Sequence, residues 1–189
     1  MLRELILKNR SFRRFDQQHA VPRETLEELV DLARLSASGG NRQPLKYVLS
    51  STEALNSEIF PNLAWAGYLT DWPGPEEGER PSAYIIMLCD TTINKNPGCD
   101  HGIAAQSIML GAAEKGLGGC MIGSFDAAGL QRVLKLEPRH EIVLVLALGK
   151  PRETVVLDTV AADGSIKYWR DERHVHHVPK RPLKDLIIR

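Results

Sequence analysis

Residues 141–149 read EIVLVLALG, the strongest strand signal in the chain, and Lys150-Pro151 follows them. A second apolar run, AYIIMLCD at 83–90, is typical of a strand at the centre of a sheet. Two weaker segments, KYVLSS at 46–51 and CMIGSF at 120–125, predict a further strand and a short strand or bend. These segments indicate a sheet that helices must cover.

The helical signals lie between these strands. The clearest is VPRETLEELVDLARLSAS at 21–38, whose Leu26, Leu29, Val30 and Ala33 follow the spacing of one helix face. DHGIAAQSIMLGAAEKGLGG at 100–119 is so rich in small and apolar residues that we expect a helix buried nearly all round, with a second subunit helping to cover it. Asp100 is its expected cap. Shorter helices are predicted at 1–9, 52–60 and 126–136.

The order of these elements predicts an α+β sandwich formed by a single domain over residues 1–189. Beyond about residue 151 the helical period is lost, and Pro179 and Pro182 interrupt the chain. We therefore expect residues 151–189 to form an extended C-terminal arm, of the kind that packs on a partner subunit.

Composition narrows the classes of function. The chain has 189 residues, 43% of them apolar, with 24 basic and 24 acidic side chains. This balance gives no general attraction to nucleic acid or to an anionic membrane, so a basic cluster must have a local purpose. Three widely spaced cysteines suit free thiols, and the N-terminus lacks a signal-peptide pattern, so a cytoplasmic location is expected.

One local basic cluster stands out at residues 10–15, RSFRRF. Arginine forks bind phosphate through two parallel hydrogen bonds, and the Ser11 hydroxyl can add another. From these residues alone, a phosphate site and a solvated basic loop are equally good interpretations. The chain has no Walker motif, and the glycines of GLGGCMIG at 116–123 follow a helix, so a dinucleotide-binding motif is poorly supported.

Two further loops carry candidate binding residues. In SASGGNRQP at 36–44, Ser38, Asn41 and Gln43 could read the edge of a heterocycle, although a helix cap followed by a turn explains the same residues. The long connection at 65–82 holds three aromatic residues that could form a substrate lid or simply pack on the core. These are Trp65, Tyr68 and Trp72. Three histidines at 174, 176 and 177 have no complete metal-ligand pattern beside them.

Taken together, these segments resemble the FMN-dependent nitroreductase family. Arg10, Ser11, Arg13 and Phe15 match its R-S-x-R-x-F opening, and SASGGNRQP is similar to its P-S-x-x-N-x-Q-P loop. Ala37 stands in place of the usual proline, and Leu45 where an aromatic residue is common. The stretches AAEKGLGGCMIGSF, LALGKP and VPKRPL resemble three later landmarks in the same order, so the resemblance covers nearly the whole chain.

The resemblance implies a three-layer sandwich with a mostly antiparallel central sheet, and a homodimer that exchanges its C-terminal arms. It also implies FMN at the dimer interface. Arg10, Ser11 and Arg13 would hold the FMN phosphate with help from Lys180 and Arg181. The flavin ring and ribityl chain would meet Ser38, Asn41 and Gln43 of the neighbouring subunit, and Met121, Ile122 and Gly123 would line the ring.

The implied reaction is ping-pong hydride transfer from NAD(P)H, through the flavin, to a nitroaromatic, a quinone or a similar small electrophile. It requires no side-chain acid or base. Four alternatives stay open at this point. The chain could be a flavin-dependent dehalogenase, an enzyme that consumes its own flavin, a flavin-binding protein without turnover, or a phosphate-binding module without flavin.

Overall fold

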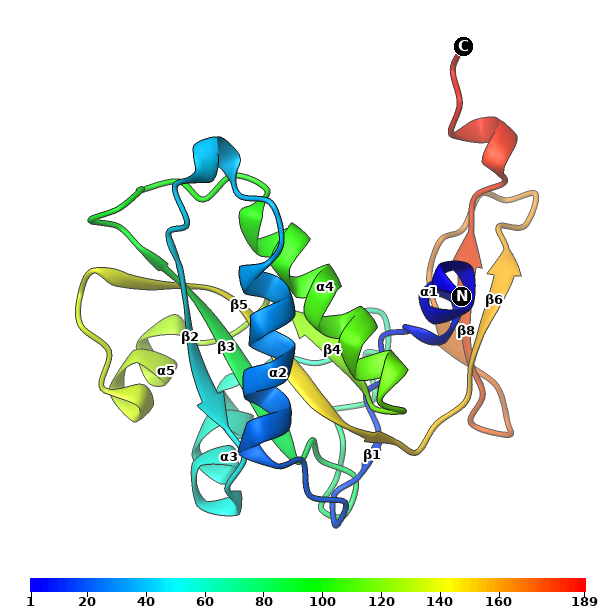
Figure 1. The fold of residues 1–189 in the computed structure, drawn as a ribbon. Coiled ribbons are helices and arrows are strands. Elements are labelled where there is room, and N and C mark those ends of the chain that lie inside the picture. The colour runs from blue at the N-terminus through cyan, green and yellow to red at the C-terminus, as the bar shows by residue number, and fades with distance from the viewer.

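The computed structural model describes all 189 residues, which form five α-helices and eight strands. The helices are α1 (Leu2–Lys8), α2 (Arg23–Arg34), α3 (Glu53–Ile59), α4 (Asp100–Glu114) and α5 (Ala127–Leu134). The strands are β1 (Phe15–Asp16), β2 (Leu45–Ser50), β3 (Ala83–Asp90), β4 (Gly118–Ile122), β5 (His140–Pro151), β6 (Val155–Thr159), β7 (Trp169–Arg170) and β8 (His176–Lys180). Figure 1 shows a main body and a smaller C-terminal part that stands beside it.

The main body is built on one five-stranded sheet. Its strands run in the order β1-β5-β3-β2, with β4 also paired to β5, and every pair is antiparallel. All eight residues of β3 are buried, as a continuous apolar run predicts for a strand between two neighbours. The mixed fold and the mostly antiparallel sheet are confirmed.

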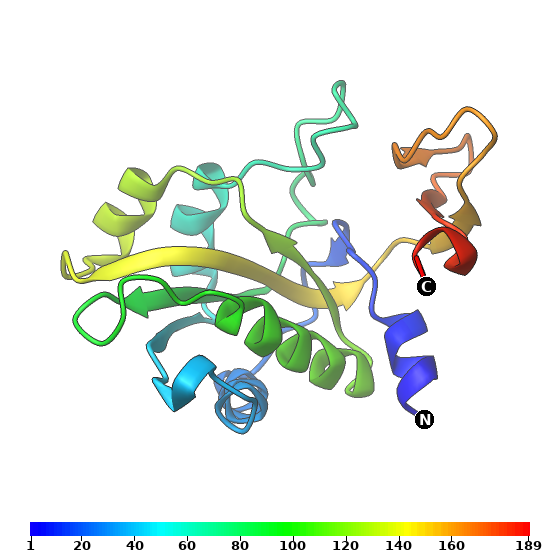
Figure 2. The same ribbon diagram turned by 90° about the horizontal axis from the view of Figure 1, so that it is seen from above.

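Helices cover both faces of this sheet, which gives three layers (Figure 2). On one face α2 and α4 pack on Ile85, Met87 and Leu146. On the other face Ile59 of α3 and Leu130 of α5 pack with the alternate residues of the same strands. Successive side chains of a strand point to opposite faces, so β3 and β5 supply both cores at once.

Helix α4 differs from the sequence prediction in its start and in its burial. It begins after Cys99, so Asp100 is its first helical residue and not its cap. It ends at Glu114, and Gly116 takes a left-handed φ of 70° that breaks the helix. Its buried side packs on α2 and the sheet, whereas Gly102, Ile103 and Gln106 are exposed. The helix is therefore buried on one side only within a single protomer.

The C-terminal part is more structured than the expected extended arm. Strands β6, β7 and β8 form a separate sheet in which β6 and β8 are parallel and β7 and β8 antiparallel. The sequence pattern does not predict this sheet, because its strands are short, partly exposed and joined across a long connection. Beyond β8, the last residues point away from the body (Figure 1).

None of the helices combines the length and the apolar composition needed to cross a bilayer.

Candidate functional site

The basic segment at residues 10–13 lies along the free edge of β4. Ser11 forms a parallel bridge with Gly119, and the backbone N–H of Phe12 donates to the Gly119 carbonyl at 2.9 Å. Glycine is required here because a Cβ on Gly119 would collide with the Ala147 carbonyl oxygen and one on Gly118 with the Phe12 ring. Gly118 therefore lets the basic segment lie directly against the sheet, and Gly119 lets β4 pair closely with β5.

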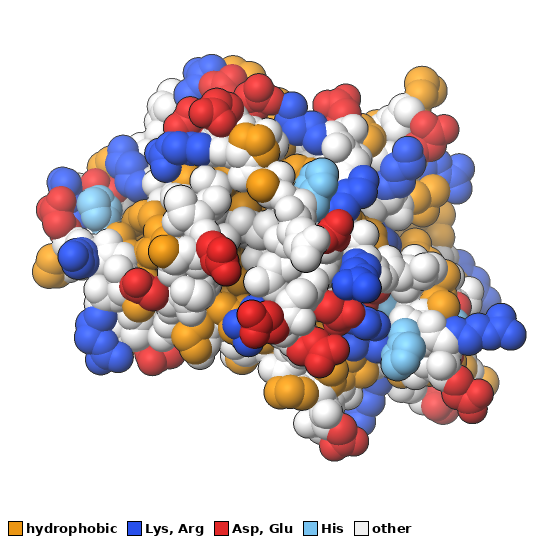
Figure 3. Space-filling model, turned by 90° about the horizontal axis from the view of Figure 1, so that it is seen from below, with side chains coloured by type: hydrophobic (Ala, Val, Ile, Leu, Met, Phe, Trp, Pro, Cys, Tyr) orange, Lys and Arg blue, Asp and Glu red, His pale blue; other side chains and the backbone are white.

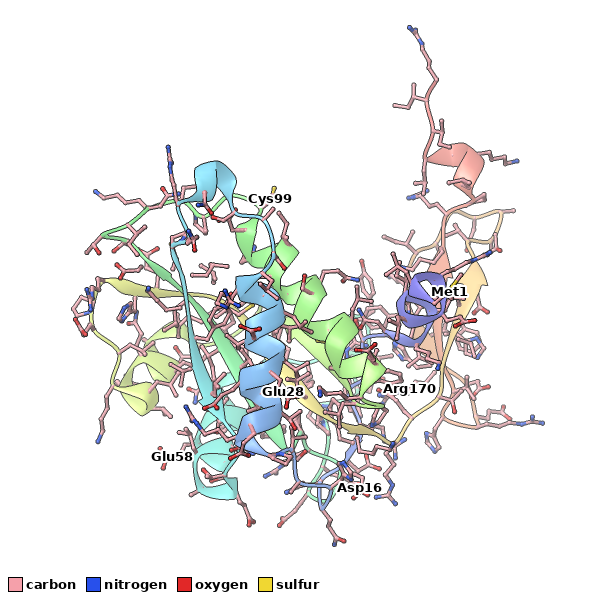
Figure 4. The ribbon with its side chains drawn as sticks, viewed as in Figure 1. Met1, Asp16, Glu28, Glu58, Cys99 and Arg170 are labelled. Atoms are coloured by element: carbon pink, nitrogen blue, oxygen red, sulfur yellow. The ribbon has the colours of Figure 1, made fainter.

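Two of the nearby arginines are neutralised by carboxylates. Arg14 donates through Nε to Oε2 of Glu79 at 2.6 Å, and this hydrogen bond raises the pKa of Arg14 and lowers the pKa of Glu79. Arg170 donates through Nη2 to Oε2 of Glu153 at 3.0 Å. Arg170 lies where the C-terminal part meets the body (Figure 4).

Arg10 and Arg13 have no carboxylate partner. Arg10 donates only to the Ile6 carbonyl, at 2.6 Å, and its Nε is buried without an acceptor. Burial lowers the pKa of Arg10. Nη1 of Arg13 lies 3.3 Å from the Ser11 carbonyl oxygen and 3.2 Å from Nε2 of His176. Because these two partly buried guanidiniums have no anionic partner, they favour the binding of an anion near the N-terminal segment.

Strand β4, which lies beside these arginines, ends at the residues that are predicted to line the flavin ring. Met121 is exposed, Ile122 is buried, and Gly123 has open space around it at the end of β4. Gly123 lies four positions beyond Gly119 in the chain, which corresponds to about 13 Å of extended backbone. The predicted phosphate and ring residues therefore share one edge of one protomer. Cys120 between them is buried, and burial raises the pKa of its thiol.

The loop after α2 is tightly organised. Oγ of Ser38 donates to Asp100 at 2.6 Å, the Gly39 N–H donates to the same carboxylate at 2.8 Å, and the Gln43 N–H donates to Oγ of Ser38 at 2.9 Å. Asn41 and Gln43 have positive φ angles of 53° and 52°, which non-glycine residues rarely adopt. Their side chains are left exposed. Such strain held by hydrogen bonds is typical of a binding loop.

A small cavity of about 190 Å³ lies behind this loop. Ser38, Gln43, Tyr47 and Asp100 are among the residues that line it. Burial, with a contribution from the Asp100 charge, raises the pKa of Tyr47 to about 12, so its hydroxyl stays protonated.

The loop and the basic segment lie near opposite ends of α4. Asp100, which holds Ser38, is the first residue of this helix, and Phe12 lies against Gly118, four residues beyond its end. Fifteen residues of α-helix span about 22 Å. In Figure 4, Cys99 marks the N-terminal end of α4. One protomer therefore does not bring Ser38, Asn41 and Gln43 to Arg10, Ser11 and Arg13.

Lys180 and Arg181 also lie outside this cluster. Both are exposed at the end of β8, and neither side chain makes a hydrogen bond or ion pair. His176, which contacts Arg13, is four strand residues earlier, about 13 Å away. The structure of the single chain does not place the two basic groups in contact.

The three aromatic residues of the long loop have different surroundings. Trp65 is buried in the core with Ile59 and Leu130, as the packing interpretation predicts. Trp72 packs against the same core, and the Arg170 guanidinium lies 4.2 Å from its ring centre. Tyr68 is half exposed and contacts the Tyr168 ring at 4.9 Å. Of the three, Tyr68 is the most exposed.

Histidines of β8 complete the surroundings of Arg13. His176 is buried, and burial together with the Arg13 and Arg170 charges lowers its pKa to about 4. For His177, burial alone would lower the pKa, but hydrogen bonds to Asp158 and Asp171 raise it. No group of three or more His, Cys, Asp or Glu side chains in the chain is arranged to hold a metal ion.

The neutral state of His176 predicts a pH dependence of stability. Because its folded pKa of about 4 lies below the unfolded value of about 6.5, the unfolded chain binds more protons between these values. The contribution of neutral His176 to the free energy of unfolding is therefore complete above pH 6.5. It is lost as the pH falls towards 4, and the loss is about 2 kcal/mol at pH 5. Urea unfolding at pH 7 and pH 5 should show that the free energy of unfolding falls less for His176→Gln than for the wild-type chain. An equal fall in the free energy of unfolding for both chains would contradict the neutral state of His176.

A larger cavity, about 660 Å³, lies elsewhere, between β1, α3 and the loop before β3. Figure 3 views this side of the molecule, where uncharged polar groups and backbone form the centre. Its side chains already serve the fold, since Gln17 accepts from the backbone of Gly78 and Arg80, and Asn56 bonds Ser50 and Ser82. None of the predicted site residues lines it, so we place the candidate site at β4.

Sequence reasoning missed four residues of this cluster. Glu153, Tyr168, Arg170 and His176 all come from the C-terminal part and surround Arg13 and Arg14. Their spacing follows no motif, because the contacts depend on how the small sheet packs on the N-terminal segment.

Comparison with known proteins gives a consistent result. The model of the nitroreductase family matches residues 6–73 and 92–150. A Methanothermobacter thermautotrophicus protein named for NADH dehydrogenase and NAD(P)H nitroreductase activity is 28% identical over 158 residues, covering 79% of this chain and 77% of its own. An oxygen-insensitive NADPH nitroreductase of Helicobacter acinonychis is 26% identical, covering 78% of this chain and 86% of its own.

Solved structures share the fold. A nitroreductase-type protein of Exiguobacterium sibiricum, solved in complex with FMN, aligns with a TM-score of 0.67 at 17% identity. The alignment covers 81% of this chain and 89% of the other.

Proposed function

This chain belongs to the nitroreductase family, and from that premise we propose that it is an FMN-dependent oxidoreductase. It would take hydride from NAD(P)H and pass it to small electrophilic acceptors such as nitroaromatics or quinones. Relatives that carry the name NAD(P)H nitroreductase, and a structural neighbour solved with FMN, support the proposal. The dehalogenase and flavin-consuming alternatives have no observation in their favour here.

The observation that carries the proposal is the pair of arginines without a carboxylate. Arg10 and Arg13 flank Ser11 in the sequence, and the buried Nε of Arg10 has no acceptor. A phosphate dianion would supply acceptors to both guanidiniums, each through charge-assisted hydrogen bonds. The residues present therefore fit the FMN phosphate.

The remaining parts of the proposed site follow from β4. Met121, Ile122 and Gly123 would line the flavin ring, and a backbone N–H near its reactive nitrogen would stabilise the negative charge of the reduced form. Bound FMN would supply the hydride-accepting and hydride-donating chemistry. The chain's own residues would bind the cofactor and orient NAD(P)H and the acceptor in turn on the same face, with Tyr68 at the edge.

We propose that a homodimer completes the site. Apolar side chains stay exposed on α1, α2 and α4, which pack together on one side of the body, namely Leu2, Ile6, Leu7, Leu32, Leu35 and Ile103. A second copy on this surface would bury them and could bring its own Ser38, Asn41 and Gln43 to the flavin. Lys180 and Arg181 would approach the phosphate once the C-terminal part is packed in the dimer.

A visible spectrum tests the proposal directly. Purified protein supplied with FMN should be yellow, should bleach when NADH or NADPH is added without oxygen, and should regain its colour when a quinone is added. Protein that stays colourless after gel filtration would support a phosphate-binding module without flavin. Yellow protein that neither nucleotide bleaches would support a flavin-binding protein without turnover.

A further inference from the structure

Glu153 is the most completely enclosed charged side chain of the candidate site. It lies in the connection between β5 and β6, and its side chain is only 1% exposed. One carboxylate oxygen, Oε1, accepts from the backbone N–H groups of both Arg13 and Arg14, the latter at 3.2 Å. The other oxygen accepts from Arg170. The carboxylate thus joins the N-terminal segment to the C-terminal part.

This arrangement fixes the backbone from which the Arg13 side chain projects. The guanidinium itself is held by two other groups of the C-terminal part: Nε2 of His176 accepts from it at 3.2 Å, and the Tyr168 ring lies 4.8 Å from its centre. Because His176 has the lowered pKa described above, it stays neutral and can accept this bond near neutral pH. Backbone and side chain of Arg13 are therefore both set by residues far along the sequence.

We propose that Glu153 is a positioning residue that aims Arg13 at the phosphate of the cofactor and couples the C-terminal part to cofactor binding. The proposal rests on the function proposed above. A carboxylate beside an anion site would by itself repel a phosphate. The contacts of Glu153 indicate that its hydrogen bonds to the segment outweigh that repulsion.

Charge repulsion and positioning of Arg13 predict opposite changes in FMN binding for Glu153→Gln. This substitution removes a negative charge near the bound phosphate, so a purely electrostatic role predicts tighter FMN binding. A positioning role predicts weaker binding, because an amide offers one oxygen acceptor in place of two carboxylate oxygens. We expect the Kd for FMN to rise at least roughly tenfold, as the loss of one charge-assisted hydrogen bond would produce.

The test is a fluorescence titration of FMN with the wild-type chain, Glu153→Gln, and Glu172→Gln as the matched control. Glu172 is an exposed carboxylate of the same C-terminal part and makes no side-chain hydrogen bond. Thermal unfolding establishes that each variant is folded at the assay temperature. If Glu153→Gln does not fold, Glu153→Asp replaces it, since it keeps the charge but shortens the reach by one methylene.

Repeating the substitution in the Arg13→Ala background separates positioning from general destabilisation. If Glu153 acts through Arg13, its substitution should change the FMN Kd little once the Arg13 side chain is gone. An equal loss in both backgrounds, tighter binding, or a Kd that matches Glu172→Gln would overturn the inference. Failure of the wild-type chain to bind FMN would instead overturn the proposed function.

Discussion

Arg13→Ala should weaken FMN binding roughly a hundredfold without unfolding the protein. A guanidinium can donate two charge-assisted hydrogen bonds to a phosphate, each contributing about 1.5 kcal/mol or more, and 1.4 kcal/mol corresponds to tenfold in Kd. The backbone N–H of residue 13 would still donate to Glu153, so the segment should keep its place. Equilibrium titration of FMN measures the effect.

Arg132→Ala is the control for this experiment. Arg132 is an exposed arginine on α5, on the face of the sheet opposite α2 and α4. Its replacement by alanine removes the same charge without touching the site. We expect its Kd to match that of the wild-type chain. An unchanged Kd for FMN in Arg13→Ala would contradict the proposal that Arg13 binds the FMN phosphate.

The residue pattern was sufficient to predict a sheet covered by helices, whereas its three layers were implied only by the family resemblance. Residues 83–89 and 142–149 carry no charged side chain, and such runs are typical of strands that lie between neighbouring strands with both faces covered. The helix over 21–38 follows from the spacing of Leu26, Leu29 and Ala33, all of which are buried. In these segments local pattern and tertiary packing agree.

The C-terminal part could not be predicted in the same way. Strands β6 and β8 are parallel and separated by residues 160–175, and their side chains alternate only partly between buried and exposed positions. Pairing of this kind is determined by contacts distant in sequence, such as Glu153 with Arg14 and Arg170 with Trp72. The sequence shows the charges and aromatic rings but not which of them meet.

The basic segment shows the same limit at the level of single residues. The sequence alone allows Arg10, Arg13 and Arg14 equally as anion ligands. The structure separates them, because Arg14 is paired with Glu79 while Arg10 and Arg13 have no carboxylate. Which arginine is available therefore depends on which acidic side chain the fold brings to it.

The central claim is that each flavin site takes its phosphate ligands from one protomer and the loop of Asn41 and Gln43 from the other. The separation of the two groups along α4 supports this proposal. Hybrid dimers can test it. One chain would carry Arg13→Ala, and the other would carry glycine at positions 41 and 43, where a positive φ suits glycine and the loop should keep its shape.

Co-expression with two different tags isolates the hybrid, and FMN titration counts its tight sites. Each parent homodimer should bind FMN weakly at both sites. The hybrid should hold about one tightly bound FMN per dimer, because one of its shared sites contains no substitution. A hybrid with no tight site would show that each site lies within a single protomer, and it would contradict the account.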